Sequence, residues 1–401
     1  MRISTNSIYD AGVARLGDLQ SGLQKTQQQI ATGRRILTPA DDPVGAARAL
    51  DLTQGQAVNT QFASNRQNAV NALSVEEGVL QSVTSLMQDA KVLTVQAGNG
   101  ALDDGQRKYL AEDLRSRFDE LMGLANSRDG VGNYMFAGYQ VTSQPFSKTT
   151  TGASYAGDQG QTMLQVDASR QMALGDSGEA LFEGVKATGT FKARVEKGAL
   201  NVAAPLSVVD STLLTGHNYD ISFKTSPAAF AVYDLTLDPT KTGTPLTTGA
   251  YTTPQTIAFD GQKLTVSGAP AAGDLVSVKP SGKQSIFTTL QDLITLLETP
   301  ATGATGKANL TYGLQIANGN IDNALDNVLV TRTSVGTRLR ELDALGEAGD
   351  NRNLQYAESL STIQDLDYNV AISDLTKQQT ILEAAQKSFV KVSGLSLFNL
   401  L

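Results

Sequence analysis

Few residues in this chain have the types and spacing that catalysis or metal binding requires. The 401 residues include one histidine and no cysteine. Thiolate nucleophiles, disulfides, Cys-ligated zinc and sites with several histidines are therefore excluded. The single histidine, His217, follows Thr215-Gly216 in a predicted turn, where a solvated side chain is more common than a catalytic one. We predict no catalytic residue, no metal and no cofactor, so the chain is not expected to be an enzyme.

Two adjacent carboxylate pairs and one glycine-rich stretch could also suggest chemistry. Asp41-Asp42 and Asp103-Asp104 each precede a helical pattern. Glycosidase carboxylates must instead face each other across a substrate, so helix capping explains these pairs better. The stretch from Gly303 to Lys307 lacks the glycine spacing of a phosphate loop, and Ala308 stands where that loop needs Ser or Thr.

Charge and composition exclude two classes of partner. The net charge is −8, Trp is absent and aromatic residues make up 6%, so a nucleic-acid partner is not expected. Membrane insertion is not expected either, since no run approaches the roughly 18 apolar residues of a membrane span. The first residues lack the apolar core of a cleaved signal peptide. We expect a cytosolic chain, or one exported without a cleaved leader.

The ends and the middle of the chain carry different patterns. Helical periodicity runs through both ends, whereas Gly, Thr, Ser, Pro and short alternating runs fill the middle. We predict an α+β fold, a rod of long antiparallel helices built from both termini, with a β-rich inserted domain. The expected parts are terminal assembly segments 1–42 and 353–401, a helical rod of 43–141 and 307–352, and an insert of 142–306.

The C-terminal part shows the clearest helical pattern. A seven-residue step, typical of a coiled-coil seam, relates Leu314, Ile321, Val328, Val335 and Leu342. A break is expected around Gly346–Asn351. The same step then returns in Leu375, Leu382 and Phe389.

The N-terminal part supplies the partner helices. A narrow apolar stripe consists of Leu16, Leu19, Leu23 and Ile30. The next helix should start at Pro43 after an Asp42 cap and stop at Gly98. If continuous, it is about 80 Å long at 1.5 Å per residue. A third helix should follow Asp103-Asp104.

The apolar stripes of the two terminal segments are narrow, and we expect that contacts within one chain cannot cover them fully. The last ten residues, 392–401, also lack charge and include Val392, Leu397 and Phe398. We therefore predict that both stripes and this tail contact adjoining subunits, and that both ends are disordered in the monomer.

The sequence pattern of the middle part of the chain predicts short strands. Alternating runs flank Asp260-Gly261, a strong hairpin signal. A short helix from Phe287 to Leu297 should close the insert, and Thr299–Gly306 should be a linker.

A family resemblance follows from one long stretch and three short ones. Residues 32–50, TGRRILTPADDPVGAARAL, resemble the N-terminal signature of the hook-associated protein 3 family, the hook–filament junction proteins of the flagellin superfamily. Three further stretches agree with that family: Met1–Thr5, Asn133–Tyr139 and Ser396–Leu401.

The resemblance implies a structural adaptor of the bacterial flagellum. It implies export without a cleaved signal through the flagellar type III apparatus, and an extracellular ring of neighbouring subunits. The implied partners are hook-associated protein 1, flagellin and a flagellar export chaperone. The implied inter-layer hinge, where the terminal layer meets the next one, consists of Arg34, Arg35, Asp41, Asp42 and Pro43.

Two alternatives remain open at this point. The first is a minor flagellin. The second is a surface adhesin or hydrolase on a coiled-coil stalk, with the β insert as its working domain. An enzyme would have a deep pocket with convergent carboxylates in the insert.

Overall fold

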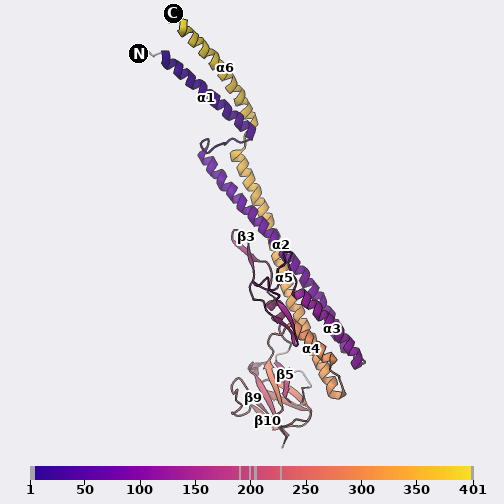
Figure 1. Ribbon diagram of the computed structural model, residues 1–401. Coiled ribbons are helices and arrows are strands. Elements are labelled where there is room, and N and C mark those ends of the chain that lie inside the picture. Colours follow the sequence, from indigo (N-terminus) through magenta and orange to yellow (C-terminus); the bar gives the residue numbers. More distant parts are fainter. Residues whose placement is uncertain (1–4, 189–190, 198–199, 203–205, 226–227, 399–401) are drawn as a thin grey trace. The chain divides into compact units, whose positions relative to one another are not determined.

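The computed structural model describes residues 5–188, 191–197, 200–202, 206–225 and 228–398. Long helices form both ends of the chain, and strands fill the middle (Figure 1). The α-helices are α1 (Thr5–Thr32), α2 (Pro43–Ala97), α3 (Asp104–Ala125), α4 (Ile286–Glu298), α5 (Gly303–Gln364) and α6 (Tyr368–Phe398). The strands are β1 (Phe146–Thr149), β2 (Gly152–Tyr155), β3 (Met163–Asp167), β4 (Arg170–Ala173), β5 (Phe191–Lys197), β6 (Asn201–Val202), β7 (Ser207–Val208), β8 (Tyr219–Thr225), β9 (Ala228–Asp234), β10 (Thr247–Ala250), β11 (Gln255–Phe259), β12 (Gln262–Ser267) and β13 (Leu275–Pro280).

The predicted helix starts and stops of the N-terminal part are confirmed. Helix α2 begins at Pro43, and the Asp42 carboxylate accepts the Gly45 N–H at 2.8 Å. Helix α3 begins with a capping box, in which Asp103 and Gln106 each accept the other's backbone N–H. These caps satisfy amide donors that the first helical turn leaves free.

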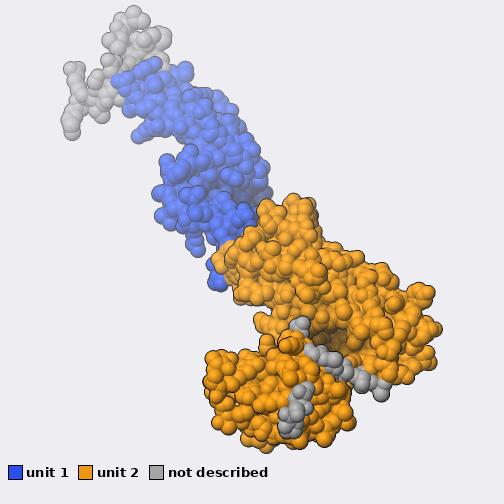
Figure 2. Space-filling view, turned by 60° about the horizontal axis from the view of Figure 1, so that its bottom comes forward, with its two compact units in different colours: residues 1–66, 166–169, 343–401 blue, residues 67–165, 170–342 orange. Residues whose placement is uncertain are grey.

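The chain forms two compact units (Figure 2). Unit 1 contains residues 1–66, 166–169 and 343–401, and unit 2 contains 67–165 and 170–342. In unit 2 the seven-residue repeat of α5 is buried throughout, from Leu314 to Leu342. On α2, Leu73, Leu80 and Met87 are buried as well. The predicted seam of α5 and these side chains of α2 therefore belong to the helical core of unit 2.

Helix α5 corrects one expectation. No break occurs at Gly346–Asn351, because α5 continues to Gln364. Within unit 1, Gly349 is buried, and its carbonyl accepts the Asn59 side-chain amide at 2.7 Å. A β-carbon at Gly349 would lie 2.3 Å from an Arg66 nitrogen. The glycine thus serves close packing rather than chain termination.

A β-sandwich forms most of the insert. One antiparallel sheet has the strand order β10-β9-β8-β13-β5, and the other has β11-β12-β6, with β7 also pairing with β12. Both sheets contribute side chains to one apolar core, including Tyr219, Phe223, Phe259 and Leu264. Alternating burial along β12 explains the alternating sequence pattern.

The turn and short-helix predictions of the insert are confirmed with one adjustment. Asp260 and Gly261, both with positive φ, join β11 to β12, with Phe259 opposite Gln262. Helix α4 spans Ile286–Glu298. The expected linker Thr299–Gly306 is shorter than predicted, because α5 already starts at Gly303. Among the described residues, no helix carries an apolar stretch long enough to cross a bilayer.

Candidate subunit interface and inter-layer hinge

Helices α1 and α6 pair antiparallel within unit 1 (Figure 1). The Thr26 hydroxyl donates to the Gln378 side-chain oxygen at 3.0 Å. Nearer the chain ends, the rings of Tyr9 and Phe389 lie 5.1 Å apart, and a β-carbon at Gly12 would lie 2.7 Å from the Phe389 ring. The two ends of the chain therefore meet along their length.

The predicted interface residues lie at half-buried positions of this helix pair. They are Leu16, Leu19, Leu23 and Ile30 on α1 and Leu375, Leu382 and Phe389 on α6. Only Thr26 of α1 and Ala371 of α6 are buried among the described side chains of these helices. Val392, Leu397 and Phe398 also belong to α6, but their side chains lie outside the described residues. A single helix pair leaves this stripe partly in contact with solvent.

A second set of apolar side chains on the same helices is exposed, and the sequence reasoning missed it. Val370 is 56% exposed and Val390 is 68% exposed. The complete set is Tyr9, Val13, Tyr368, Val370, Ile372, Ile381 and Val390. Their spacing does not follow the seven-residue step, so the seam pattern did not include them. These exposed side chains offer apolar contact positions along both helices to an adjoining molecule.

Two loops lie side by side at the predicted hinge. One joins α1 to α2 (residues 33–42), and the other joins α5 to α6 (365–367). The Arg35 N–H donates to the Gln364 carbonyl at 2.7 Å, and the Leu366 N–H donates to the Gly33 carbonyl at 3.0 Å. Arg34 and Asp365 form an isolated antiparallel bridge. The backbone thus ties the two connections together.

Arg35, Asp42 and Pro43 connect this link to α2. The Arg35 guanidinium donates to Asp42 at 3.2 Å and to the Ile363 carbonyl at 3.0 Å. Asp42 also caps the helix that starts at Pro43. The Gly45 N–H, together with Arg35, lowers the pKa of Asp42. The Asp42 carboxylate therefore connects the Arg35 guanidinium of the loop to the first turn of α2.

Asp41 has a separate task in folding the loop. Its carboxylate accepts the N–H groups of Leu37 and Thr38 at 3.1 and 2.9 Å, and the Lys25 ammonium of α1 lies 2.6 Å away. Lys25 and the Thr38 N–H lower the pKa of Asp41 to about 2. The loop is thereby fixed to α1. The structure brings together Arg34, Arg35, Asp41, Asp42 and Pro43, the five predicted hinge residues.

Gly33 lies within the predicted hinge, although the sequence reasoning did not include it. Its φ is +70°, and a β-carbon would meet the Tyr368 hydroxyl at 3.0 Å. Gly33 therefore ends α1 with a left-handed turn directly beside the start of α6. The Thr32-Gly33 pair after a helical stripe is the signal that could have identified it.

Two of the residues considered for catalysis, His217 and Asp103, make hydrogen bonds within the fold. His217 Nδ1 lies 2.6 Å from an Asp234 carboxylate oxygen, and Asp103 is the cap described above. Among the described residues, no group of three or more His, Cys, Asp or Glu side chains is arranged to hold a metal ion.

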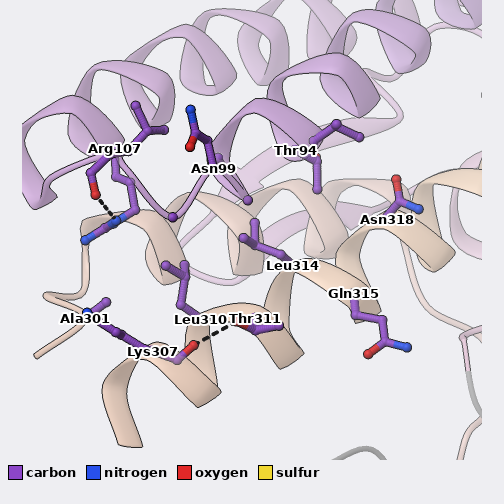
Figure 3. Close-up of a pocket in the computed structure, with 15 residues that line it drawn as sticks. Thr94, Asn99, Arg107, Ala301, Lys307, Leu310, Thr311, Leu314, Gln315 and Asn318 are labelled. Atoms are coloured by element: carbon purple, nitrogen blue, oxygen red, sulfur yellow. Dashed lines mark hydrogen bonds between the residues drawn. The ribbon is translucent and has the colours of Figure 1, made fainter. Parts of the chain in front are cut away.

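A cavity of about 620 Å³ lies in unit 2, between the end of α2 and the first turns of α5 (Figure 3). Leu310 and Leu314 of α5 form part of its lining, and the Arg107 side chain donates to the Leu102 carbonyl at 2.6 Å. Its described lining includes no Asp, Glu or His. The cavity therefore has mixed apolar and polar walls, with the cations Arg107 and Lys307 but no carboxylate among its described lining residues.

Known proteins resemble the chain in both sequence and fold. The family model of the bacterial flagellin N-terminal helical region matches residues 3–141. Flagellar hook-associated protein 3 of Escherichia coli is 30% identical over 401 residues, covering 100% of this chain and 99% of the relative. A flagellin of Bacillus subtilis is 32% identical but covers only 33% of this chain and 42% of the relative.

The comparison with solved structures agrees. The crystal structure of flagellar hook associated protein-3 from Legionella pneumophila has a TM-score of 0.65 at 29% identity and covers 78% of this chain and 98% of that chain. The predicted α+β fold class and the resemblance drawn from residues 32–50 are confirmed. The chain belongs to the flagellar hook-associated protein 3 family.

Proposed function

We propose that this chain forms the junction layer between hook-associated protein 1 and the flagellin filament by packing α1 and α6 against those of adjoining copies. As a hook-associated protein, it is a structural component of the flagellum. The observation that carries the proposal is the exposed apolar set of α1 and α6, which the helix pair leaves uncovered. We infer no enzymatic activity.

Burial energies support assembly through these helices. Fully burying a Val, Leu, Ile or Phe side chain contributes about 1.5–3 kcal/mol. The α1–α6 pair of one chain obtains only part of this gain, because its stripe is half-buried. Adjoining copies in a ring would cover the rest and offset the entropy cost of ordering the helices. Ends that are disordered in the monomer would present no preformed helical surface, which would keep the exported chain from polymerising early.

The bonds of the hinge support a division into layers. In this proposal residues 1–42 and 353–401 form the inner layer, 43–141 and 307–352 form the next layer, and 142–306 face outward. The loop 33–42 lies at the proposed boundary between 1–42 and 43–141, and backbone hydrogen bonds tie it to the loop 365–367, which lies inside the proposed segment 353–401. They would transmit bending between layers while the chain stays connected at two points.

Further partners follow from the same proposal. Export would proceed through the flagellar apparatus without a cleaved signal, to an extracellular position. A cytosolic export chaperone would cover the apolar ends before export. The uncharged residues 392–401 suit such a partner, because an apolar tail in water is prone to association.

Deletion of the gene, followed by imaging of the cells, tests the proposal. The expected result is intact hooks without filaments, with flagellin released into the medium. Re-expression of the wild-type chain should restore filaments. Normal filaments in the deletion strain would contradict the junction role. A minor flagellin or a stalked adhesin would give this result.

A further inference from the structure

A pocket of about 220 Å³ in unit 2 lies beside the buried carboxylate of Glu76. Helix α2, the loop after α3, and the segments before β3 and after β4 form its walls. Glu76, Asp129 and Asp176 all line the pocket, whereas its described lining includes no Lys or Arg. A cation is the complementary ligand for such a lining.

One oxygen of Glu76 lacks a partner in the described structure. Glu76 is 1% exposed, and its Oε1 accepts the Asp176 N–H at 3.0 Å. Its Oε2 is buried without a hydrogen-bond partner. A buried acceptor left in this state is costly and calls for a donor.

The nearby cations are bound to other carboxylates. The Arg338 guanidinium donates to Asp176, which also accepts the Gln161 amide at 3.0 Å. On the same helix as Glu76, Glu77 pairs with Arg332 at 2.6 Å. Neither arginine donates to Glu76 Oε2, which therefore remains available to a ligand.

Gly175 keeps the space beside this oxygen open. A β-carbon there would lie 3.8 Å from Glu76 Oε2 and 3.9 Å from the Met135 carbonyl oxygen. Glu76 Oε2 and the Met135 carbonyl oxygen thus both border the free volume beside Gly175. The Asp129 carboxylate accepts the N–H groups of Val131 and Asn133 at 2.9 and 2.8 Å, so it adds mainly negative potential.

The chemistry of these groups selects the ligand. A metal ion would need several converging ligands, which the described residues do not provide. A primary ammonium group has three donors on a compact charged head and suits one carboxylate oxygen and one carbonyl. We propose that this pocket binds a primary alkylammonium group through Glu76 Oε2 and the Met135 carbonyl. A lysine side chain of an adjoining copy and a free amine share this chemistry.

Protons should compete with the ligand. Burial raises the pKa of Glu76 to about 8, and the charge of Asp176 adds to this effect. Glu77 acts in the same direction and Arg338 opposes it. An ammonium ion favours only the ionised carboxylate. The apparent affinity should therefore fall about 100-fold from pH 9 to pH 6.

Calorimetric titration of the full chain with n-butylammonium chloride at equal ionic strength tests the proposal. At pH 9 we expect saturable binding, and tetramethylammonium, which has no N–H donor, should not bind. Glu76→Gln and Gly175→Ala should each weaken binding at least tenfold. The matched control Gly282→Ala, with no atom near its added methyl, should bind as the wild type does.

Sedimentation at pH 9 distinguishes the two sources. If the wild-type chain self-associates, and both Glu76→Gln and added butylammonium prevent this, the ligand is a lysine side chain of an adjoining copy. Butylammonium binding to a chain that stays monomeric identifies a free amine. The proposal is overturned if wild-type chain fails to bind butylammonium at pH 9, or if Gly175→Ala binds it unchanged; Gly175→Ala carries the test even if Glu76→Gln fails to fold.

Discussion

Single residues in this chain act mainly by position rather than by reactivity. The acidic pair Asp41-Asp42 illustrates this: one carboxylate fixes the loop to Lys25, and its neighbour caps α2. Gly33 contributes only its backbone freedom. Glu76 differs, because it is a buried acid with an unpartnered oxygen. Its titration should therefore affect stability.

Replacing Glu76 by Gln should flatten the dependence of stability on pH. The folded-state pKa of Glu76 is raised from 4.5 to about 8. The protonated form thus favours folding fully below pH 4.5, and this contribution disappears as the pH rises towards 8. Thermal unfolding in amine-free buffer should show the wild type losing on the order of a few kcal/mol between pH 5 and 8. Glu76→Gln should lose much less, and parallel curves for the two proteins would contradict the assignment.

Replacing Gly33 by Ala should weaken the hinge. The added methyl would stand at a left-handed φ and against the Tyr368 hydroxyl, at a cost of about 1–2 kcal/mol. Cells that express this variant in place of the wild type should shed filaments under shear, as counted by electron microscopy. Gly22→Ala on α1, whose methyl meets no atom within 4 Å, is the control and should retain them.

At the scale of elements, helix α5 shows how a glycine can be misread. Gly346 and Gly349 resemble a stop signal, yet α5 passes through both. Gly349 lies against Arg66, which donates to the Val166 carbonyl at 3.1 Å, whereas Gly346 borders open space. The two positions should therefore respond to alanine in opposite directions.

The Gly346→Ala and Gly349→Ala pair tests this difference. Gly346→Ala should stabilise the chain by about 0.5–1 kcal/mol through helix propensity. Gly349→Ala should destabilise it by about 1–3 kcal/mol, because Arg66 must leave its place. Urea unfolding measures both. Equal effects from the two variants would show that close packing at Gly349 does not contribute to the free energy of unfolding.

The sequence predicted those elements whose signals are local. Asp42-Pro43 marked the start of α2, Asp260-Gly261 marked a hairpin, and Leu314 to Leu342 marked a buried seam. It could not locate the end of α5, because the role of Gly349 depends on Arg66, 283 residues earlier. The exposure of Val370 and Val390 was likewise hidden, since exposure depends on which helix faces pair.

At the scale of the whole molecule, the sandwich is an insertion with adjacent ends. The Ala187 N–H donates to the Gly282 carbonyl at 3.1 Å, and the Gln284 N–H donates to the Val185 carbonyl at 2.8 Å. The chain therefore leaves and re-enters the helical part at one place. The two-sheet core is made within residues 191–278 and needs no helix residue.

Excision of residues 189–281, with a short Gly-Ser linker between Thr188 and Gly282, should leave the junction role intact. Complementation of the deletion strain should restore filaments, because α1, α6 and the hinge are unchanged. Circular dichroism should show retained helix and reduced strand content. Loss of filaments by a well-folded excision variant would assign the sandwich a part in the junction.

The junction role requires the terminal helices to gain their contacts from adjoining copies. Hydrogen–deuterium exchange of α1 and α6 in the purified monomer and in isolated hook–filament complexes measures this directly. We predict exchange within seconds in the monomer and strong protection in the complex, with residues 67–97 of α2 protected in both. Equal, strong protection of α1 and α6 in the monomer would contradict the account.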